Sequence, residues 1–470
     1  MIACAVALLA TAHAAVGGVD NASGRGSSPA ATTEPAGQHD MLWSAEIPVE
    51  DIFSVELEAV GFGPGDSERG VGEDPTGVLV VVRSRTAGPH VELREGLTGE
   101  LLWRRLPGGA AGESAFASPV SESECVVAAG STLLFVNREG AVIGSARLPG
   151  LLRSAAGSGS LACVCAGSPE TGFADSLVLF ERGPGSGANS VQAVRVWSRA
   201  LVDRNTRFDD GFSRPVFADT NGDGRDELLV VERMNEIVCR ADTGNERWRV
   251  ILGEKSRFKP IGVASADPVV ADVTGDGIPD VAVGCFAGAV VVLDGELGDE
   301  IARLQFGTEA HEAHLRGRRL SSFIRDALAS TGEPIGDMLA VELNGIGGAE
   351  LVFGCSDGFV YAVSPRSGET LWRFRPGNDV YGRPVAEPGD ARRLVVWDEE
   401  CLYVLDAVTG AELATLPRSS IAAAAVLGWS DADVTVAMAD GLAGRLEAWR
   451  VRAPRDVGDT RGASHATVPE

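Results

Sequence analysis

Short apolar stretches bounded by Gly, Asp and Asn dominate the chain from Met41 onward. This pattern is typical of β-strands joined by tight turns, because strands are short and glycine adopts the positive φ angles that turns need. One unit recurs along the chain. Its first strand often begins with Pro-Val, a second apolar strand follows, a third leads to a Thr/Ser-Gly turn, and a fourth often ends in Trp. The Pro-Val pairs begin at Pro119, Pro215, Pro268 and Pro384.

The turn and the Trp that follows it mark the second half of each unit. The turns with a following Trp are Thr98-Gly99 with Trp103, Thr243-Gly244 with Trp248, and Ser367-Gly368 with Trp372; Thr409-Gly410 and Leu297-Gly298 lack the Trp. Such a unit predicts a four-stranded antiparallel blade, which cannot bury both of its faces alone. A ring of blades buries them and leaves only short edges. We therefore predict an all-β fold, a single β-propeller, in which the Trp packs between neighbouring blades.

The number of units predicts an eight-bladed ring, with seven blades as the alternative because the third and eighth units are weakly marked. The units lie at about 60–106, 113–148, 150–200, 212–250, 263–305, 335–375, 380–416 and 420–450. The last unit lacks a clear fourth strand, and the stretch Leu42–Ile47 reads as a fourth strand without a unit. Pairing these two would close the ring. The propeller is predicted over 41–450, and 451–470 is predicted to be a disordered tail.

The second half of the unit, most clearly Cys355–Val363, resembles the PQQ-like (quinoprotein, BamB-like) propeller repeat. The resemblance implies the fold. It implies no quinone site, because Val164 separates Cys163 from Cys165, whereas the quinone-dependent dehydrogenases have an adjacent Cys-Cys pair.

Two nine-residue loops, 219–227 and 272–280, stand out chemically. Each has oxygen-bearing side chains at positions one, three, five and nine and Gly at position six. Calcium prefers six to eight oxygen ligands, and a carbonyl at position seven would add one. The predicted Ca²⁺ ligands are Asp219, Asn221, Asp223, Glu227 and the carbonyl of Arg225, and Asp272, Thr274, Asp276, Asp280 and the carbonyl of Ile278. The alternative is a pair of hairpin turns without metal.

Both loops lead directly into an apolar strand, and neither has the position-twelve Glu of an EF-hand. They resemble the FG-GAP (integrin-alpha-like) repeat, which implies calcium between two strands of a blade. A third copy, 342–350, has Ile346 at position five and reads as a turn that has lost its ion. In the absence of a cation, the crowded carboxylates are expected to repel one another. Loop 219–227 is expected to bind more tightly, because Asn221 is a better donor than Thr274.

The N-terminal segment indicates export. Residues 1–14 read as a signal peptide or signal-anchor, with Ala12-His-Ala14 as an A-x-A site, and 15–40 as a flexible linker. Localisation is therefore predicted as extracellular, cell surface or periplasm, with a possible membrane anchor through the N-terminal segment.

An insertion at about 307–332 is helix-like and carries His311 and His314, a weak candidate zinc pair. The cysteines after Cys4 are expected to be mostly buried thiols, with one or two disulfides as the alternative.

The net charge of −25 argues against nucleic acid as a partner. No nucleophile elbow, phosphate loop or metalloprotease motif is present in the sequence. We therefore expect a secreted or surface-associated calcium-binding propeller that acts as a binding or adhesion module for a protein or glycan ligand. The alternative is an envelope assembly scaffold like BamB; less favoured is a propeller enzyme such as a quinoprotein dehydrogenase or polysaccharide lyase.

Overall fold

The computed structural model describes residues 39–47, 52–60, 77–110, 113–121, 123–167, 174–183, 189–198, 212–232, 235–241, 244–253, 264–306, 335–380, 382–389, 391–440 and 444–453. The predicted signal segment 1–14 and helical insertion 307–332 lie outside these residues, as do most of the linker and of the tail. Within the described part of the chain, no helix is long and apolar enough to cross a membrane.

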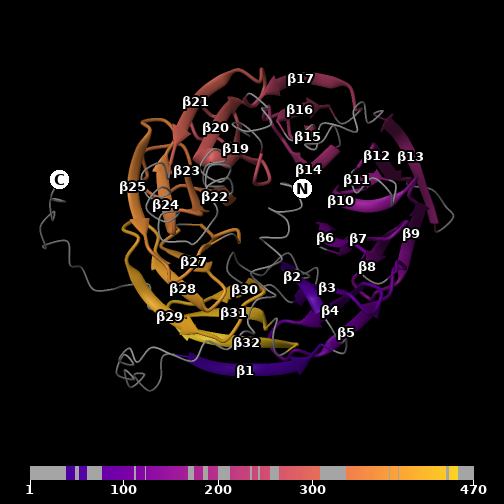
Figure 1. The fold of residues 1–470 in the computed structure, drawn as a ribbon, viewed down its shortest axis with the longest axis horizontal. Helices are drawn as coiled ribbons and strands as arrows, with labels where there is room; N and C mark the ends of the chain where they lie inside the picture. Colours follow the sequence, from indigo (N-terminus) through magenta and orange to yellow (C-terminus); the bar gives the residue numbers. More distant parts are fainter. Residues whose placement is uncertain are drawn as a thin grey trace, which may run out of the picture.

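Thirty-two strands in the described residues form eight four-stranded antiparallel blades arranged in a ring (Figure 1). Blade 1 contains β2 (Ile52–Val60), β3 (Gly77–Ser84), β4 (His90–Glu95) and β5 (Leu101–Arg105). Blade 2 contains β6 (Ala115–Ser121), β7 (Glu124–Ala129), β8 (Thr132–Asn137) and β9 (Val142–Arg147). Blade 3 contains β10 (Leu151–Ser158), β11 (Leu161–Gly167), β12 (Ser176–Arg182) and β13 (Asn189–Ser198). Blade 4 contains β14 (Phe212–Ala218), β15 (Glu227–Glu232), β16 (Glu236–Arg240) and β17 (Glu246–Ile251).

The second half of the ring repeats this order. Blade 5 contains β18 (Val269–Ala271), β19 (Asp280–Gly284), β20 (Ala289–Asp294) and β21 (Glu300–Gln305), with a 3-10 turn, η1 (Phe286–Gly288), between β19 and β20. Blade 6 contains β22 (Ile335–Val341), β23 (Glu350–Cys355), β24 (Phe359–Ser364) and β25 (Glu369–Phe374). Blade 7 contains β26 (Val385–Ala386), β27 (Arg393–Trp397), β28 (Cys401–Asp406) and β29 (Glu412–Pro417). Blade 8 contains β30 (Ala423–Trp429), β31 (Asp433–Asp440), β32 (Arg445–Arg452) and β1 (His39–Glu46).

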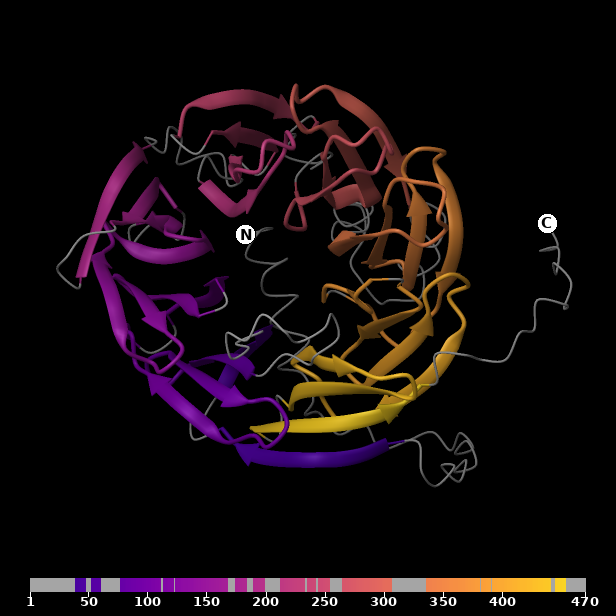
Figure 2. The same cartoon turned by 180° about the vertical axis from the view of Figure 1, so that it is seen from behind.

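The prediction of eight blades is confirmed, and the seven-bladed alternative is wrong. The ring closes as predicted, because β1 pairs antiparallel with β32, with Trp43 opposite Ala448 (Figure 2). Two boundaries differ from the prediction. Blade 1 begins at Ile52 rather than near 60, because the charged alternation around Glu56 and Glu58 conceals an inner strand. β32 continues to Arg452, because buried Val451 still pairs with Val434.

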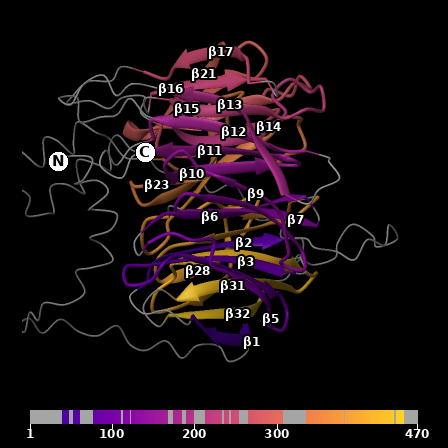
Figure 3. The same cartoon turned by 90° about the vertical axis from the view of Figure 1, so that its right-hand side faces the viewer.

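The core lies between blades rather than inside any one of them. The second strand of a blade lies between two other strands of its sheet and is almost wholly buried, as the pattern of β15 illustrates. Leu79 and Val81 of blade 1 pack with Ala115 and Cys125 of blade 2 in one apolar cluster. Seen from the side, the ring of blades forms a disc (Figure 3). Its stability therefore comes from the repeated contact between adjacent sheets.

A tryptophan latch joins several pairs of blades, as predicted. The fourth-strand Trp of one blade lies over the turn glycine of the next, and its indole N–H donates to a carbonyl of that turn. These bonds run from Trp43 to Gly96 (2.9 Å), from Trp103 to Arg138 (3.0 Å), from Trp248 to Gly295 (2.8 Å) and from Trp372 to Ala407 (2.9 Å). A Cβ at Gly99 would lie 2.5 Å from the Trp43 ring, so the ring requires glycine there.

Blades 2 and 3 are joined differently. Gly144 occupies the place that Trp103 and Trp248 hold in their own fourth strands, four residues after the turn glycine. Here β13 pairs in parallel with β9, through Asn189 opposite Gly144, and the two blades form one eight-stranded sheet. A Cβ at Gly144 would lie 2.7 Å from the Val191 side chain. The absence of a side chain at this position therefore allows the strand from blade 3 to approach.

The cysteines of the described residues are free thiols, and all of them except the half-buried Cys401 are buried. Burial raises the pKa of Cys125 and of Cys285, each to about 12. These thiols are apolar packing residues, as the main prediction held, and not members of a disulfide framework.

Trp43→Phe tests the latch at the point where the ring closes. The variant retains an aromatic ring but loses the bond to Gly96, so unfolding should become easier by about 1 kcal/mol. Trp43→Ala should cost about 3–5 kcal/mol, because it also opens a cavity. Chemical denaturation measures both. Trp449→Phe is the control, because the Trp449 indole bonds within its own strand, to Glu447. Equal losses for Trp43→Phe and Trp449→Phe would contradict the latch.

Candidate functional site

The two predicted calcium loops and their third copy join the first strand to the second in blades 4, 5 and 6. We name them loop 1 (219–227), loop 2 (272–280) and loop 3 (342–350). All three share one register, because the residue before position one pairs with position nine. The pairs are Ala218 with Glu227, Ala271 with Asp280, and Val341 with Glu350. The hairpin ladder thus fixes the start and the end of each loop.

The bend of each loop depends on two glycines in the left-handed region. Position four has φ of 73°, 77° and 68° at Gly222, Gly275 and Gly345, and position six has φ of 82°, 87° and 81° at Gly224, Gly277 and Gly347. Only the position-six glycine was predicted to be required. The position-four glycine also appears in all three copies, so comparing the loops with one another would have revealed it. Loop 3 retains this turn, as predicted.

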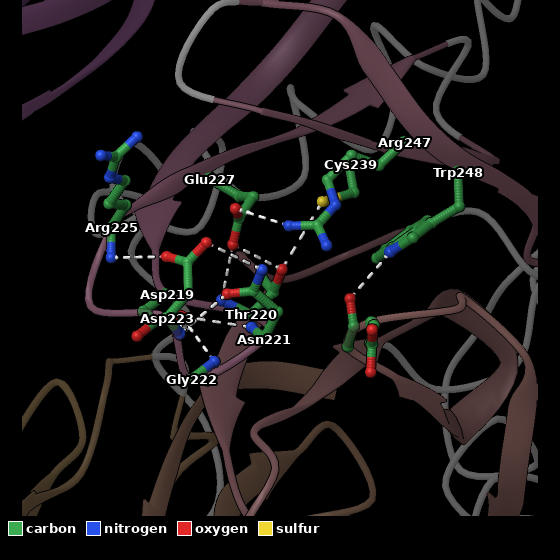
Figure 4. Close-up of polar contacts among 12 residues, drawn as sticks. Asp219, Thr220, Asn221, Gly222, Asp223, Arg225, Glu227, Cys239, Arg247 and Trp248 are labelled. Atoms are coloured by element: carbon green, nitrogen blue, oxygen red, sulfur yellow. Dashed lines mark hydrogen bonds and ion pairs between the residues drawn. The ribbon is translucent and has the colours of Figure 1, made fainter.

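The position-one carboxylate holds the interior of loop 1 (Figure 4). Asp219 Oδ1 accepts hydrogen bonds from the amides of Gly222 (2.7 Å), Asn221 and Asp223 (3.2 Å each), and Oδ2 accepts one from Gly224 (2.8 Å). Desolvation acts to raise the pKa of Asp219, but these amide hydrogen bonds outweigh it and lower the pKa. These amide hydrogen bonds stabilise the charged form of Asp219 without a metal ion, and the predicted repulsion between the loop carboxylates stays a prediction.

Asp272 plays the same part in loop 2. Its Oδ1 accepts from the amides of Gly275 (2.6 Å) and Asp276 (3.2 Å), and its Oδ2 accepts from Gly277 (2.8 Å). The Thr274 hydroxyl donates to the same carboxylate at 3.4 Å. The backbone of both loops is thus ordered by internal hydrogen bonds.

The position-nine carboxylate is buried in all three loops and accepts from the amide of position two. Glu227 Oε2 accepts from Thr220 N (2.9 Å), Asp280 Oδ2 from Val273 N (3.0 Å), and Glu350 Oε2 from Leu343 N (2.7 Å). In the sequence, Glu227 and Asp280 were assigned only to metal. The structure adds a second role, closing the loop, that follows from their place at the start of the next strand.

Loops 1 and 2 differ in charge balance at position nine. Glu227 Oε1 also accepts from Arg247 Nη1 at 2.7 Å, so an arginine neutralises it (Figure 4). Within the described chain no such ion pair forms at Asp280. Desolvation, with a smaller contribution from Asp276, raises the pKa of Asp280. Within the described residues, the position-nine carboxylate of loop 2 therefore lacks the arginine partner that neutralises the position-nine carboxylate of loop 1.

The remaining predicted ligands lie toward solvent. Asp223, the Arg225 side chain and Asp276 are exposed, and Asn221, Thr274 and Ile278 are half-buried. Asp223 accepts from Asn221 Nδ2 (3.1 Å) and from the Arg225 amide (2.9 Å), and Asp276 accepts from the Ile278 amide (2.8 Å). Each loop thus gathers its predicted oxygen donors within one turn.

The donor chemistry of the loops suits calcium, but their carboxylates are engaged by hydrogen bonds. Among the described residues, no group of three or more His, Cys, Asp or Glu side chains is close enough to hold a metal ion. A calcium ion would need, besides carboxylates, the Asn221 or Thr274 oxygen and the carbonyl at position seven. The metal assignment stays a prediction.

The loops of neighbouring blades lie against one another. The amide of Ala349 in loop 3 donates to the Asp272 carbonyl in loop 2 at 2.7 Å. Gly295, whose carbonyl accepts the Trp248 hydrogen bond, lies against loop 1 and loop 2. A Cβ there would lie 2.1 Å from the Pro279 carbonyl oxygen and 2.3 Å from that of Thr220. The latch between blades 4 and 5 and the first two loops thus meet at one residue.

Comparison with known proteins gives a partial match to one family. The family described as "Outer membrane protein assembly factor BamB" matches residues 356–462, which begin between β23 and β24 and run past the end of β32. This supports the PQQ-like part of the resemblance and leaves the FG-GAP part a hypothesis. No curated protein matches the chain.

Solved structures share the fold at low sequence identity. BamB from Moraxella catarrhalis is 13% identical, with a TM-score of 0.53, over 88% of this chain and 99% of that chain. Saccharomyces cerevisiae Sqt1 is 12% identical, with a TM-score of 0.60, over 88% and 100%. The computationally designed Ika8 protein is 14% identical, with a TM-score of 0.55, over 88% and 100%. At these identities the likeness establishes the propeller fold alone.

Gly295→Ala tests the junction of the latch and the loops. The new Cβ would overlap two carbonyl oxygens, so the backbone must shift, and we expect a loss of stability of about 1–3 kcal/mol. Gly377→Ala is the matched control, because a Cβ there would meet Tyr403 Oη at 3.4 Å, an ordinary contact distance. Thermal and urea unfolding of both variants decide the matter. Unchanged stability in Gly295→Ala would show that the junction is loose.

Proposed function

We propose that this chain is a protein-binding propeller scaffold of the BamB-like kind, acting in the cell envelope. The observation that carries the proposal is the family match over 356–462, together with the eight-bladed ring that the chain shares with BamB. A closed ring supplies a rigid disc, and binding then depends on the side chains that the disc presents. The non-enzymatic interpretation of the sequence agrees with this proposal.

The outermost strands offer surface for such binding. Large apolar side chains are exposed on the fourth strands of several blades, among them Leu102 at 45%, Val196 at 56% and Ile251 at 65%. Isolated exposed apolar residues are ordinary, but here they recur on the rim of the disc. Among the described residues, the outer edge of the fourth strands is unpaired except where β9 pairs with β13, and such an edge can accept hydrogen bonds from a partner. The rim of the ring is therefore one surface on which we place partner contacts.

Affinity capture from envelope fractions of the source organism tests this function. The immobilised chain should enrich components of outer-membrane protein assembly. Val194→Glu with Val196→Glu on β13 should reduce that enrichment at least about tenfold, because two exposed apolar side chains that the partner would cover are lost. The designed propeller Ika8 is the matched control, since it has the same fold without an evolved partner. Equal enrichment on both propellers would contradict the proposal.

Calcium binding is a second, accessory activity, favoured by the charge difference between the loops. We expect loop 2 to bind more tightly than loop 1, because Arg247 already neutralises Glu227. This reverses the order expected from Asn221 and Thr274 alone. Open loops of this kind bind in the ~10⁻⁴–10⁻³ M range. At about millimolar calcium, one site adds roughly 0.4–1.4 kcal/mol to the free energy of unfolding.

Calorimetric titration with calcium checks this order. Asp276→Ala should remove the stronger binding event, whereas Asp223→Ala should leave it and remove only a weaker one. Arg247→Met should strengthen loop 1, since it frees the Glu227 carboxylate. Absence of heat in the wild type, or loss of the same event in both Asp→Ala variants, would mean that the loops are turns without metal.

A further inference from the structure

A cavity of about 250 Å³ lies between blades 1 and 2. It is bounded by the inner strands β2 and β6, which are neighbours facing the centre of the ring (Figure 1), and by the second strand β3. The lining combines apolar walls with two carboxylates: Leu57, Leu79, Val81, Phe116, Ala117, Glu56 and Glu58. None of these residues belongs to the three loops.

The two carboxylates are not equivalent. Glu56 is half-exposed and forms an ion pair with Arg83 at 2.5 Å. Among the described residues, the only side-chain hydrogen bond that Glu58 accepts is a long one from Ser118 Oγ, at 3.4 Å. Within the described chain no cationic nitrogen lies within 4 Å of the Glu58 carboxylate. A shielded carboxylate without a cation is an unfavourable arrangement that an incoming cation would relieve.

The charged groups around Glu58 do not supply the missing cation. Desolvation is the largest effect on its carboxyl, and it raises the pKa to about 7. Glu56 on the same strand acts in the same direction, while Ser118 on β6 and the more distant Arg383, before β26, lower the pKa in part. Within the described part of the chain, the other titratable group that interacts with Glu58 is the Cys125 thiol of β7, whose pKa burial raises.

The size of the cavity selects the kind of cation. Pockets for drug-sized ligands measure ~300–1,000 Å³, so this one suits a single side chain or a small amine. Its apolar walls match the methylene stem of an arginine or lysine, and the carboxylate matches the cationic head. Within the described residues no third carboxylate, His or Cys joins the pair to hold a metal ion.

We propose that this cavity binds a basic side chain, arginine or lysine, of the protein that the ring engages. The inference rests on the proposed function for the identity of the ligand as a protein. It rests on the cavity itself for the chemistry. The chain's net charge of −25 adds a favourable long-range field for such a basic segment.

Titration of the full chain with N-acetyl-arginine methylamide tests the cavity directly, with the uncharged N-acetyl-citrulline methylamide as the matched probe. The arginine probe should bind in the millimolar range and the citrulline probe at least about tenfold more weakly, since the bond to a charged group is lost. Glu58→Gln should weaken arginine binding by a similar factor. Glu300→Gln, whose carboxylate pairs with Arg303 on blade 5, should leave it unchanged.

The pH dependence has a definite sign. A carboxyl with a pKa of about 7 is largely protonated at pH 6 and ionised at pH 8, so the affinity for arginine should rise between these values. In wild-type protein, carbon NMR of the Glu58 carboxyl should show its pKa falling as the probe is added. This reading needs no variant, so it decides the inference even if Glu58→Gln fails to fold.

The inference is overturned if the two probes bind equally, if folded Glu58→Gln binds arginine as the wild type does, or if the pKa of Glu58 does not change when the probe is added. Its failure is distinguishable from failure of the proposed function. Saturable arginine binding with no captured envelope partner would leave the cavity site and remove the scaffold. Capture of envelope partners by a chain that shows no arginine binding would support the scaffold and rule out the cavity site.

Discussion

The indole of one blade over the turn of the next is the contact on which the ring depends. A four-stranded sheet has two apolar faces, and only a neighbouring sheet can cover them. The Trp of the fourth strand fixes how that neighbour sits, because its ring needs the bare glycine and its N–H needs a carbonyl in the same turn. Trp43 and Trp248 show both requirements met. Buried indole nitrogens rarely go unpaired, so the angular position of each blade that receives such a bond is tightly set.

The exceptions to the latch explain the irregular parts of the ring. At blade 2 the Trp position is Gly144, and the space is used by the strand β13, which joins two blades into one sheet. At blade 5 the equivalent residue is Ala302, and Leu304 lies over the turn glycine Gly368 instead, at 3.6 Å from a Cβ placed there. Repeats can therefore lose the Trp where another apolar or backbone contact covers the same turn.

Much of this fold could be predicted, because its determinants are local and repeated. The Thr/Ser-Gly turns, the Trp positions and the unpaired Leu42–Ile47 strand are readable in the sequence, and together they gave the eight blades and the closure. The inner strand of blade 1 was missed, because Glu56 and Glu58 interrupt its apolar pattern. These same residues line the cavity. The charged residues that interrupt the apolar pattern of β2 therefore mark the place where this strand carries carboxylates beside the cavity.

The candidate site was predictable in its residues but not in its electrostatics. The spacing of Asp219, Asn221, Asp223 and Glu227 places them in one turn, as the hairpin register of β14 and β15 requires. Their partners come from elsewhere. Arg247 lies 20 residues from Glu227 along the chain, on β17, and nothing in the loop sequence indicates that the two meet. The need for glycine at Gly295 is equally long-range, since it arises from carbonyls of two loops in two blades.

These contacts determine what an ion could do in the loops. The internal hydrogen bonds of Asp219 and Asp272 already order the backbone, so calcium would act on a formed structure rather than create one. Any shift it caused in loop 1 would reach the Thr220 carbonyl, which lies against Gly295, whose own carbonyl holds Trp248. A loop ion would therefore act through the latch between blades 4 and 5. The cavity between blades 1 and 2 lies outside this path, so the two sites can be tested, and can fail, independently.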